Sequence, residues 1–251
     1  MAEIEYRGTN YHGFEKQKSK IPTIQQELES AFSKIANHPI NLVVAGRTDA
    51  GVHASGQVVH FDTVANRNLD AWVTGANSLL PQDIAVLKAT EVNAHFHARF
   101  SAQARTYQYR IICRPAKLAL EAQTAFWSYA DLNVDKMQQA ANYLLGEHDF
   151  SAFRATSCQA KTPVRTVFLL DIYHNEQVII STIKANAFLH HMVRNIMGSL
   201  VLVGKGKKPV AWVNEVLRSK KRANAGPTIS ARGLSLVKVD YLTESSKSLE
   251  I

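Results

Sequence analysis

The apolar positions in the first half of the chain alternate between helical and strand spacing. Residues 22–39, "PTIQQELESAFSKIANHP", place apolar side chains on one helical face, with Thr23 and Gln26 spaced as an N-cap pair and Pro39 beyond the end. Residues 69–81 carry a second helical pattern, which stops at Pro81. Runs rich in β-branched residues predict strands at residues 40–46, 55–63, 84–92 and 104–113.

The second half repeats this mixture of elements. Helices are predicted at residues 133–146, 188–204 and 209–219, with Asn133 as the N-cap of the first. Residues 164–173 and 177–185 are spaced as a hairpin around "HNEQ", and residues 234–242 predict a closing strand.

Strands that come in pairs, without strict alternation of strand and helix, indicate an α+β fold rather than a parallel doubly wound sheet. We therefore expect two lobes that share a largely antiparallel sheet, with helices on one side and the active cleft between the lobes. The composition changes near residues 115–130 without a long linker. This change predicts an N-terminal lobe at residues 1–115 and a C-terminal lobe at residues 116–251.

Composition and charge narrow the class of protein. With 46% hydrophobic and 20% charged residues, the chain has the composition of a folded globular protein. Its formal net charge of +8 favours a polyanionic partner or an anionic membrane surface. The sequence has no signal peptide pattern and no run of ~18 apolar residues, so we expect a cytoplasmic protein that does not enter a membrane. Cys113 and Cys158 have the spacing of neither a zinc site nor a disulfide framework.

The stretch "AGRTDAGVHASGQVVHF", residues 45–61, brings several polar groups together directly after a predicted strand. A tight turn explains Asp49 and Gly51, but it does not explain Arg47 and His53 in the same loop. An aspartate is an anion at neutral pH and can act as a nucleophile, a base or a metal ligand. The nearest other carboxylate, Asp62, lies one strand away, so we do not expect a metal site.

Within this stretch, "GRTDAGVHA" resembles the signature loop of tRNA pseudouridine synthases of the TruA type. Further blocks resemble the same family in the same order: "EYRGTNYHGFEKQ", "FHARFSA" followed by "RTYQYRI", "LLGEHDFSAFRA", "KANAFLHHMVRNIMGSLVLVG" and "GLSLVKVDY". Together these blocks extend over nearly all of residues 5–241.

The resemblance implies an enzyme that isomerises uridine to pseudouridine at positions 38, 39 and 40 of the tRNA anticodon stem-loop, without a cofactor or a metal. It implies that Asp49 is the catalytic aspartate, and that the protein is a homodimer in which one tRNA touches both subunits. The reaction breaks the bond from N1 to C1′, turns the uracil and joins C5 to C1′. It needs a carboxylate near C1′, a surface that holds the free uracil and a group that removes the C5 proton. Attack on C6, attack on C1′ and removal of a 2′ proton all stay open as the role of Asp49.

The resemblance also implies catalytic roles for Tyr107, which stacks on the target base, and for Arg194, which pairs with the catalytic aspartate. On spacing alone, Tyr107 in a strand would be a core residue. Arg194 is expected to share a helical face with His190 and His191. Adjacent helical residues point about 100° apart, so these two histidines are not expected to bind zinc.

Substrate binding is assigned to Arg47, His53, Arg105, Tyr107, Arg110 and Leu234. Arg47 is expected to hold a phosphate or to fill the space of the displaced nucleotide, whereas His53 either binds the substrate or only orients the loop. Residues 92–120 contain no acidic residue and mix arginines with aromatic residues. This pattern suits RNA better than a plain solvated face does. Basic groups at residues 205–208 and 218–222 resemble phosphate contacts.

Three residues depart from the family pattern near the N-terminus. Arg7, Phe14 and Glu15 stand where aspartate, tryptophan and glutamine are usual, which affects the N-terminal edge and its RNA contacts rather than the catalytic loop. Two other functions stay open: a non-catalytic RNA-binding protein of the same fold, and a hydrolase that uses Asp49 as a nucleophile on a small substrate. The combination of a carboxylate, a tyrosine and an arginine in matching positions favours the isomerase.

Overall fold

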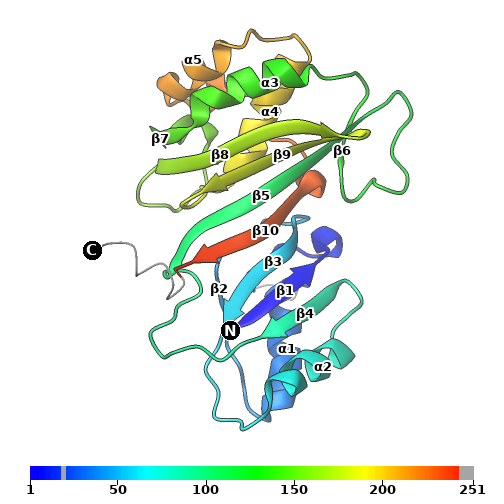
Figure 1. The fold of residues 1–251 in the computed structure, drawn as a ribbon, viewed down its shortest axis with the longest axis vertical. Helices are drawn as coiled ribbons and strands as arrows, with labels where there is room; N and C mark the ends of the chain where they lie inside the picture. Colours follow the sequence, from blue (N-terminus) through cyan, green and yellow to red (C-terminus); the bar gives the residue numbers. More distant parts are fainter. Residues whose placement is uncertain (18–20, 243–251) are drawn as a thin grey trace. The chain divides into compact units, whose positions relative to one another are not determined.

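A computed structural model describes residues 1–17 and 21–242, which form two compact units (Figure 1). Unit 1 is Met1–Arg105 together with the segment that begins at Leu236, and unit 2 is Thr106–Ser235. Over these described residues, no helix combines the length and the apolar character that crossing a membrane requires.

Unit 1 is built on a sheet whose strand order is β4-β1-β3-β10, with β2 paired to β3. The strands are β1 (Ala2–Tyr6), β2 (Val43–Val44), β3 (His53–His60), β4 (Ile84–Ala89) and most of β10 (Leu234–Tyr241). Strand β1 pairs antiparallel with both β3 and β4, and β2 pairs antiparallel with β3. Helices α1 (Ile24–Ala36) and α2 (Leu69–Leu79) pack together, and α2 lies along β4 (Figure 1).

Local signals set the bounds of helix α1. The Thr23 hydroxyl accepts a hydrogen bond from the backbone N–H of Gln26 at 3.4 Å, which satisfies one of the unpaired donors of the first turn. The helix ends at Ala36, and its C-cap Asn37 has a left-handed φ of 57°. Leu28 and Phe32 are fully buried, so the predicted apolar face is the one that packs on the unit. The prediction for this helix is confirmed.

Unit 2 has the strand order β5-β9-β8-β7, with β6 paired to β5. The strands are most of β5 (Ala102–Cys113), with β6 (Phe126–Ser128), β7 (Gly146–Asp149), β8 (Val164–Asn175) and β9 (Val178–Ala185). The pairs β7–β8 and β8–β9 are antiparallel, and the pair β5–β6 is parallel. The predicted hairpin is confirmed, and its turn places Glu176 at a φ of 54°.

The three helices of unit 2 pack together, and one of them also packs on the hairpin. They are α3 (Val134–Ala141), α4 (Met192–Gly204) and α5 (Trp212–Ser219). Helix α3 contacts α4, α5 and β8 (Figure 1). Short 3₁₀ turns at Gly8–Asn10, Asn142–Leu144, Ser151–Phe153, Arg222–Asn224 and Ala231–Gly233 complete the described elements. The predicted α+β class, with largely antiparallel strand pairing and packed helices, is confirmed.

The helix predicted at residues 188–204 begins only at Met192. His191 precedes it with a φ of 61°, a left-handed conformation that interrupts an α-helix. His190 and His191 therefore lie in a turn before α4. The prediction that Arg194 shares a helical face with these two histidines is wrong.

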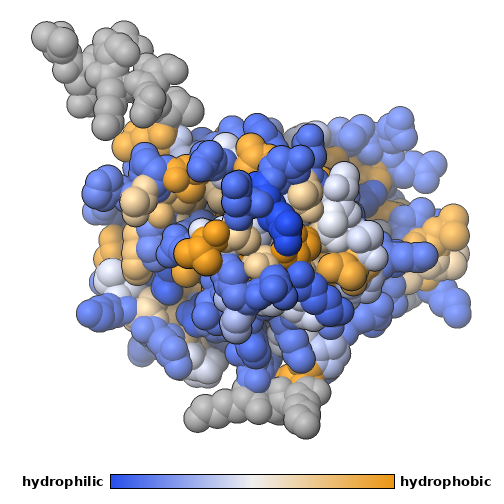
Figure 2. Space-filling view, turned by 90° about the horizontal axis from the view of Figure 1, so that it is seen from below, coloured by the Kyte–Doolittle hydropathy of each residue, from blue (hydrophilic) through white to orange (hydrophobic). Residues whose placement is uncertain are grey.

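The face of the molecule seen in Figure 2 is largely hydrophilic, with apolar side chains scattered in small groups among polar ones. This distribution is ordinary for a folded chain, because apolar atoms always contribute part of the accessible surface. Most of the side chains that this face offers to a binding partner are therefore hydrophilic.

Candidate active site

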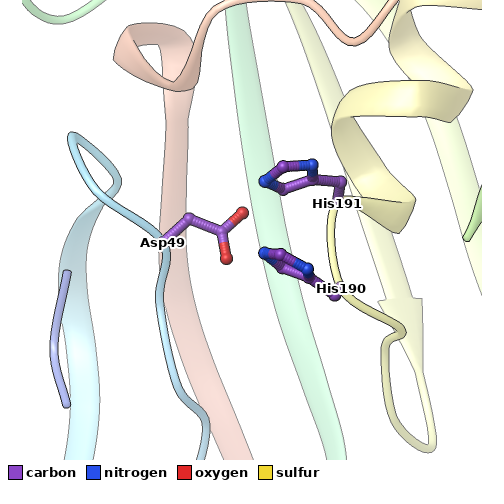
Figure 3. Close-up of side chains that lie close together, drawn as sticks. All are labelled: Asp49, His190 and His191. Carbon is purple, nitrogen blue, oxygen red and sulfur yellow. The ribbon is translucent and has the colours of Figure 1, made fainter. Parts of the chain in front are cut away.

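The loop between β2 and β3 holds Asp49 in a tight turn (Figure 3). The backbone N–H of Val52 donates to the carbonyl of Asp49 at 3.1 Å, and Gly51 adopts a φ of 77°. A residue with a Cβ would be strained at this φ, so the glycine of the motif follows from the turn itself. The side chain of Asp49 is half-buried.

Two buried side chains of unit 1 form hydrogen bonds with the loop that carries Asp49. The side-chain amide of Gln57 donates to the carbonyl of Gly46 at 2.7 Å and to the phenol oxygen of Tyr6 at 3.2 Å. The Tyr6 phenol and the Thr48 hydroxyl are 2.7 Å apart and share a hydrogen bond. Burial raises the pKa of Tyr6 to about 12, so the phenol stays protonated and keeps this network at neutral pH. The residues on both sides of Arg47 are thus fixed through Gln57 and Tyr6.

The N-terminal segment of unit 1 also contacts this loop. The backbone N–H of Phe14 donates to the Thr48 carbonyl at 3.0 Å, and the Phe14 ring is fully buried. Backbone contact is close at Gly13, where an added Cβ would lie 2.9 Å from the Thr48 carbonyl oxygen. Nδ1 of the buried His53 accepts a hydrogen bond from the Gly8 N–H at 3.1 Å. His53 therefore links the exit of the loop to this segment, which agrees with an orienting role.

Arg105 lies buried beside the start of the loop. Its guanidinium donates to the carbonyls of Ala45 at 2.9 Å, Arg99 at 2.7 Å and Ala102 at 3.0 Å. Hydrogen bonds from a charged donor to carbonyls are stronger than neutral ones. These contacts give Arg105 a positioning role toward the loop that the sequence did not indicate.

Arg47 has an acidic partner on the N-terminal segment. Its Nη1 lies 2.8 Å from Oε2 of Glu15, and the two side chains are 48% and 56% exposed. An exposed ion pair of this kind contributes only about 0–1 kcal/mol. Glu15 therefore binds Arg47 only weakly, and a stronger anion can replace it.

Tyr107 lies on β5 in unit 2, with only 7% of its surface exposed. Its ring meets the Phe188 ring edge-on, with centroids 5.0 Å apart and an interplanar angle of 83°. Two residues on, the phenol of Tyr109 donates to the Ser230 carbonyl at 2.7 Å, and burial raises its pKa well above the usual range. The edge contact with the Phe188 ring thus fixes the orientation of the Tyr107 ring.

Arg194 lies in the first turn of α4, where its Nε donates to the carbonyl of Ile229 at 2.8 Å. Ahead of the helix, the rings of His190 and His191 lie close together, with centroids 4.0 Å apart (Figure 3). The argument that two adjacent histidines must point about 100° apart is therefore wrong here, because neither residue is helical. Nδ1 of His190 lies 3.1 Å from the Ser157 hydroxyl.

Two further assigned residues lie near each other in unit 2. Arg110 is half-buried on β5, and Leu234 begins β10 with its side chain buried. Gly233, next to Leu234, approaches the carbonyl oxygen of Arg110 so closely that an added Cβ would lie 2.7 Å from it. Of the predicted site residues, unit 1 carries Arg47, Asp49, His53 and Arg105, and unit 2 carries Tyr107, Arg110, Arg194 and Leu234.

Comparison with known families assigns the chain. A family model described as tRNA pseudouridine synthase matches residues 2–101 and 140–242. The chain belongs to the tRNA pseudouridine synthase family. Proteins called tRNA pseudouridine synthase A from Tolumonas auensis, Pseudomonas aeruginosa and Aeromonas hydrophila are 51%, 48% and 53% identical to this synthase. The matches cover 95%, 95% and 96% of this chain and 91%, 84% and 89% of those proteins. The predicted resemblance is confirmed, and the chain is an isomerase of this family.

Unit 2 of the synthase also carries a basic groove of about 460 Å³. It is lined by Lys136, Lys207 and Lys208 together with residues 206 and 209–210. The ammonium group of Lys208 lies 5.2 Å from the centre of the Trp212 ring, a cation–π contact. Two of the three lysines belong to the basic group that the sequence indicated, and Lys136 joins them only through the fold.

Proposed function

We propose that this synthase converts the uridines at positions 38, 39 and 40 of tRNA to pseudouridine, with Asp49 as the catalytic carboxylate. The single observation that carries the role of Asp49 is its place in the motif loop: a half-buried carboxylate in a turn whose neighbours are held by hydrogen bonds and close backbone contacts. A reacting group held in this way needs little reorganisation, which is what attack or proton removal at a sugar or base requires. Neither a metal nor a cofactor takes part in this proposal.

Tyr107 and Arg194 complete the proposed chemistry. Tyr107 holds the uracil by stacking, and the edge contact with Phe188 keeps its ring in one orientation for this task. Arg194 pairs with the catalytic carboxylate, and its bond to the Ile229 carbonyl supports the proposal because it restricts the guanidinium. His53, Arg105, Arg110 and Leu234 stay predicted substrate contacts, although His53 and Arg105 already have partners that fix the loop.

The isomerisation is tested by tritium release. An unmodified tRNA transcript with tritium at uridine C5 is incubated with the purified protein, because joining C5 to C1′ must release the C5 hydrogen. We expect release that depends on the protein and requires no added metal. Binding of the tRNA without release from any of several transcripts would instead favour a non-catalytic RNA-binding protein, and turnover of a small ester without either would favour a hydrolase.

The positive charge of the synthase supports tRNA as its partner. The chain carries a formal net charge of +8, and three lysines line the basic groove on unit 2, a charge that suits the phosphates of a polyanion. Lysine–phosphate contacts release counterions, so they give affinity and a dependence on salt without reading sequence. We also propose that the enzyme works in the cytoplasm, where its tRNA substrate is found.

The ion pair between Arg47 and Glu15 predicts how binding responds to a neutral residue 15. If Arg47 contacts a tRNA phosphate, the phosphate must displace Glu15 first. Changing Glu15→Gln removes this competition, and we expect tRNA to bind about two- to fivefold more tightly at low salt, the range that an exposed ion pair allows. Filter binding of the unmodified transcript at several salt concentrations measures the effect.

The matched control for this prediction is the same change in an Arg47→Gln background. Without the arginine, Glu15→Gln has no ion pair to break, so the gain should disappear. Arg47→Gln alone should reduce the log–log salt slope of binding by about 0.7–0.9, the value of one phosphate contact. An equal gain in both backgrounds would show that Glu15 only repels RNA through its charge.

We propose a homodimer, as the family resemblance implies. Exposed apolar side chains on β8 support it: Phe168 and Leu169, 54% and 44% exposed, lie at a bulge in the pairing with β9, and Tyr173 is exposed further along the strand. Large apolar side chains grouped on a surface are typical of interaction sites.

Phe168→Asp should convert the dimer to a monomer, measured by size-exclusion chromatography with light scattering, whereas Phe168→Leu should leave it intact. A dimer that survives the aspartate would place the interface elsewhere.

A further inference from the structure

The segment between β4 and β5 exposes the aromatic ring of Phe100 to solvent. Phe100 is 76% exposed, although Ala98 in the same turn is fully buried. Exposing an aromatic ring to water is unfavourable, and a surface position gives no folding benefit in return. Single exposed apolar residues are common, so the contacts around the ring decide whether it forms a built surface.

His97 backs this ring on one side. The two rings are stacked, with centroids 4.2 Å apart and an interplanar angle of 27°. Nδ1 of His97 accepts hydrogen bonds from the backbone N–H groups of Arg99 at 3.2 Å and of Phe100 at 3.1 Å. The Ser101 hydroxyl accepts from the His97 N–H at 3.0 Å, and the Ser101 N–H donates to the His97 carbonyl at 2.9 Å. The stacked pair is therefore fixed by its own turn.

The turn is also fixed to the core of unit 1. Arg105 donates to the Arg99 carbonyl at 2.7 Å, and the Tyr241 phenol donates to the Ala98 carbonyl at 2.8 Å. Nδ1 of His60 accepts from the Ala98 N–H at 3.1 Å. Burial and the neighbouring His97 lower the pKa of His60, which keeps this nitrogen available as an acceptor at neutral pH. An exposed ring on so well fixed a turn is preorganised for a ligand.

The charge around the ring indicates the kind of ligand. The guanidinium of Arg99 lies 5.8 Å from the centre of the Phe100 ring. Residues 92–120, which include this turn, contain no acidic residue. An aromatic face next to an arginine is the combination with which proteins hold unpaired bases: the base stacks on the ring and the cation meets the backbone.

We propose that His97, Arg99 and Phe100 form a stacking platform for an unpaired base of the tRNA substrate. The exposed part of the Phe100 ring contacts the base, the stacked His97 ring supports it, and Arg99 contacts a neighbouring phosphate. The platform rests on the proposed function, since it assumes tRNA as the substrate. It is a binding site in unit 1 made of other residues than the loop of Asp49, to which Arg105 links it through the carbonyls of Ala45 and Arg99.

Equilibrium binding of an unmodified tRNA transcript over a series of salt concentrations tests the platform. Phe100→Leu keeps an apolar side chain but removes the ring, and we expect about 5- to 100-fold weaker binding with an unchanged salt slope. Arg99→Gln should instead reduce the log–log slope by about 0.7–0.9. Phe100→Trp should retain the affinity, and its added tryptophan emission should be quenched when tRNA stacks on it.

Tyr129 provides the control, because it is an aromatic residue that is 69% exposed and lies two residues from Asp131. Tyr129→Leu should bind tRNA like the wild type. Wild-type affinity of Phe100→Leu, an equal loss in Tyr129→Leu, or unquenched tryptophan emission would each overturn the platform. If the wild type releases tritium and Phe100→Leu binds normally, the stacking proposal alone fails. A wild type that neither binds tRNA nor releases tritium would overturn both the platform and the proposed function.

Discussion

Changing Asp49→Asn is expected to abolish the isomerisation while tRNA binding stays within about twofold of the wild type. The amide has nearly the size of the carboxylate, and the hydrogen bonds at Gly46, at Thr48 and between Val52 and the Asp49 carbonyl do not depend on the charge of the Asp49 side chain. The turn should therefore keep its shape. A neutral amide can neither attack carbon nor accept a proton, so the rate should fall by about 10²- to 10⁴-fold or more. Tritium release in a single turnover, at saturating protein, measures this loss directly.

The control for this change is Asp62→Asn. Asp62 is an exposed carboxylate just after β3, so the substitution removes the same charge from the same unit. We expect its single-turnover rate and its affinity for tRNA to stay near those of the wild type. A rate close to wild type in Asp49→Asn would remove Asp49 from the chemistry. A lower melting temperature together with lost binding would give it a structural role instead.

The sequence predicted those parts of the fold that depend on local signals. Helix α1 carries its own cap at Thr23, its apolar face and its end, and the hairpin β8–β9 is encoded by two β-rich runs around one turn. For the same reason the turn at Gly51 follows from the motif itself. The α+β class could be predicted because these local elements occur in pairs along the chain.

The support of the candidate site could not be predicted, because it depends on contacts between distant segments. No spacing rule connects Tyr6 with Thr48 and Gln57, and none places the guanidinium of Arg105 on the carbonyl of Ala45. The left-handed conformation at His191 likewise interrupts an apolar run that favours a helix locally. The roles of the site residues and the lobes at residues 1–115 and 116–251 stay predictions.

Gly13→Ala is the second change with a large expected effect, because Gly13 touches the backbone of the Asp49 loop. Its φ is 97°, and an added Cβ would lie 2.9 Å from the Thr48 carbonyl oxygen and 3.4 Å from the carbonyl carbon of Asp49. Backbone atoms cannot turn aside as a flexible side chain does, so the segment and the loop must move apart. A shift of about 1 Å at reacting groups costs about 10²-fold in rate. We therefore expect a loss of about 10- to 100-fold in single-turnover tritium release, with a much smaller change in tRNA affinity.

Gly146→Ala separates this displacement from the strain of a left-handed residue. Gly146 also has a positive φ, 91°, but an added Cβ there meets only Nε2 of His148 at 3.9 Å, an ordinary contact distance. Both alanines should lower stability by about 1–2 kcal/mol through the backbone, which thermal unfolding measures. Only Gly13→Ala should slow the isomerisation, because only its methyl group presses on the loop. An equal loss of rate in both variants would mean that global stability, rather than the position of Asp49, limits the reaction.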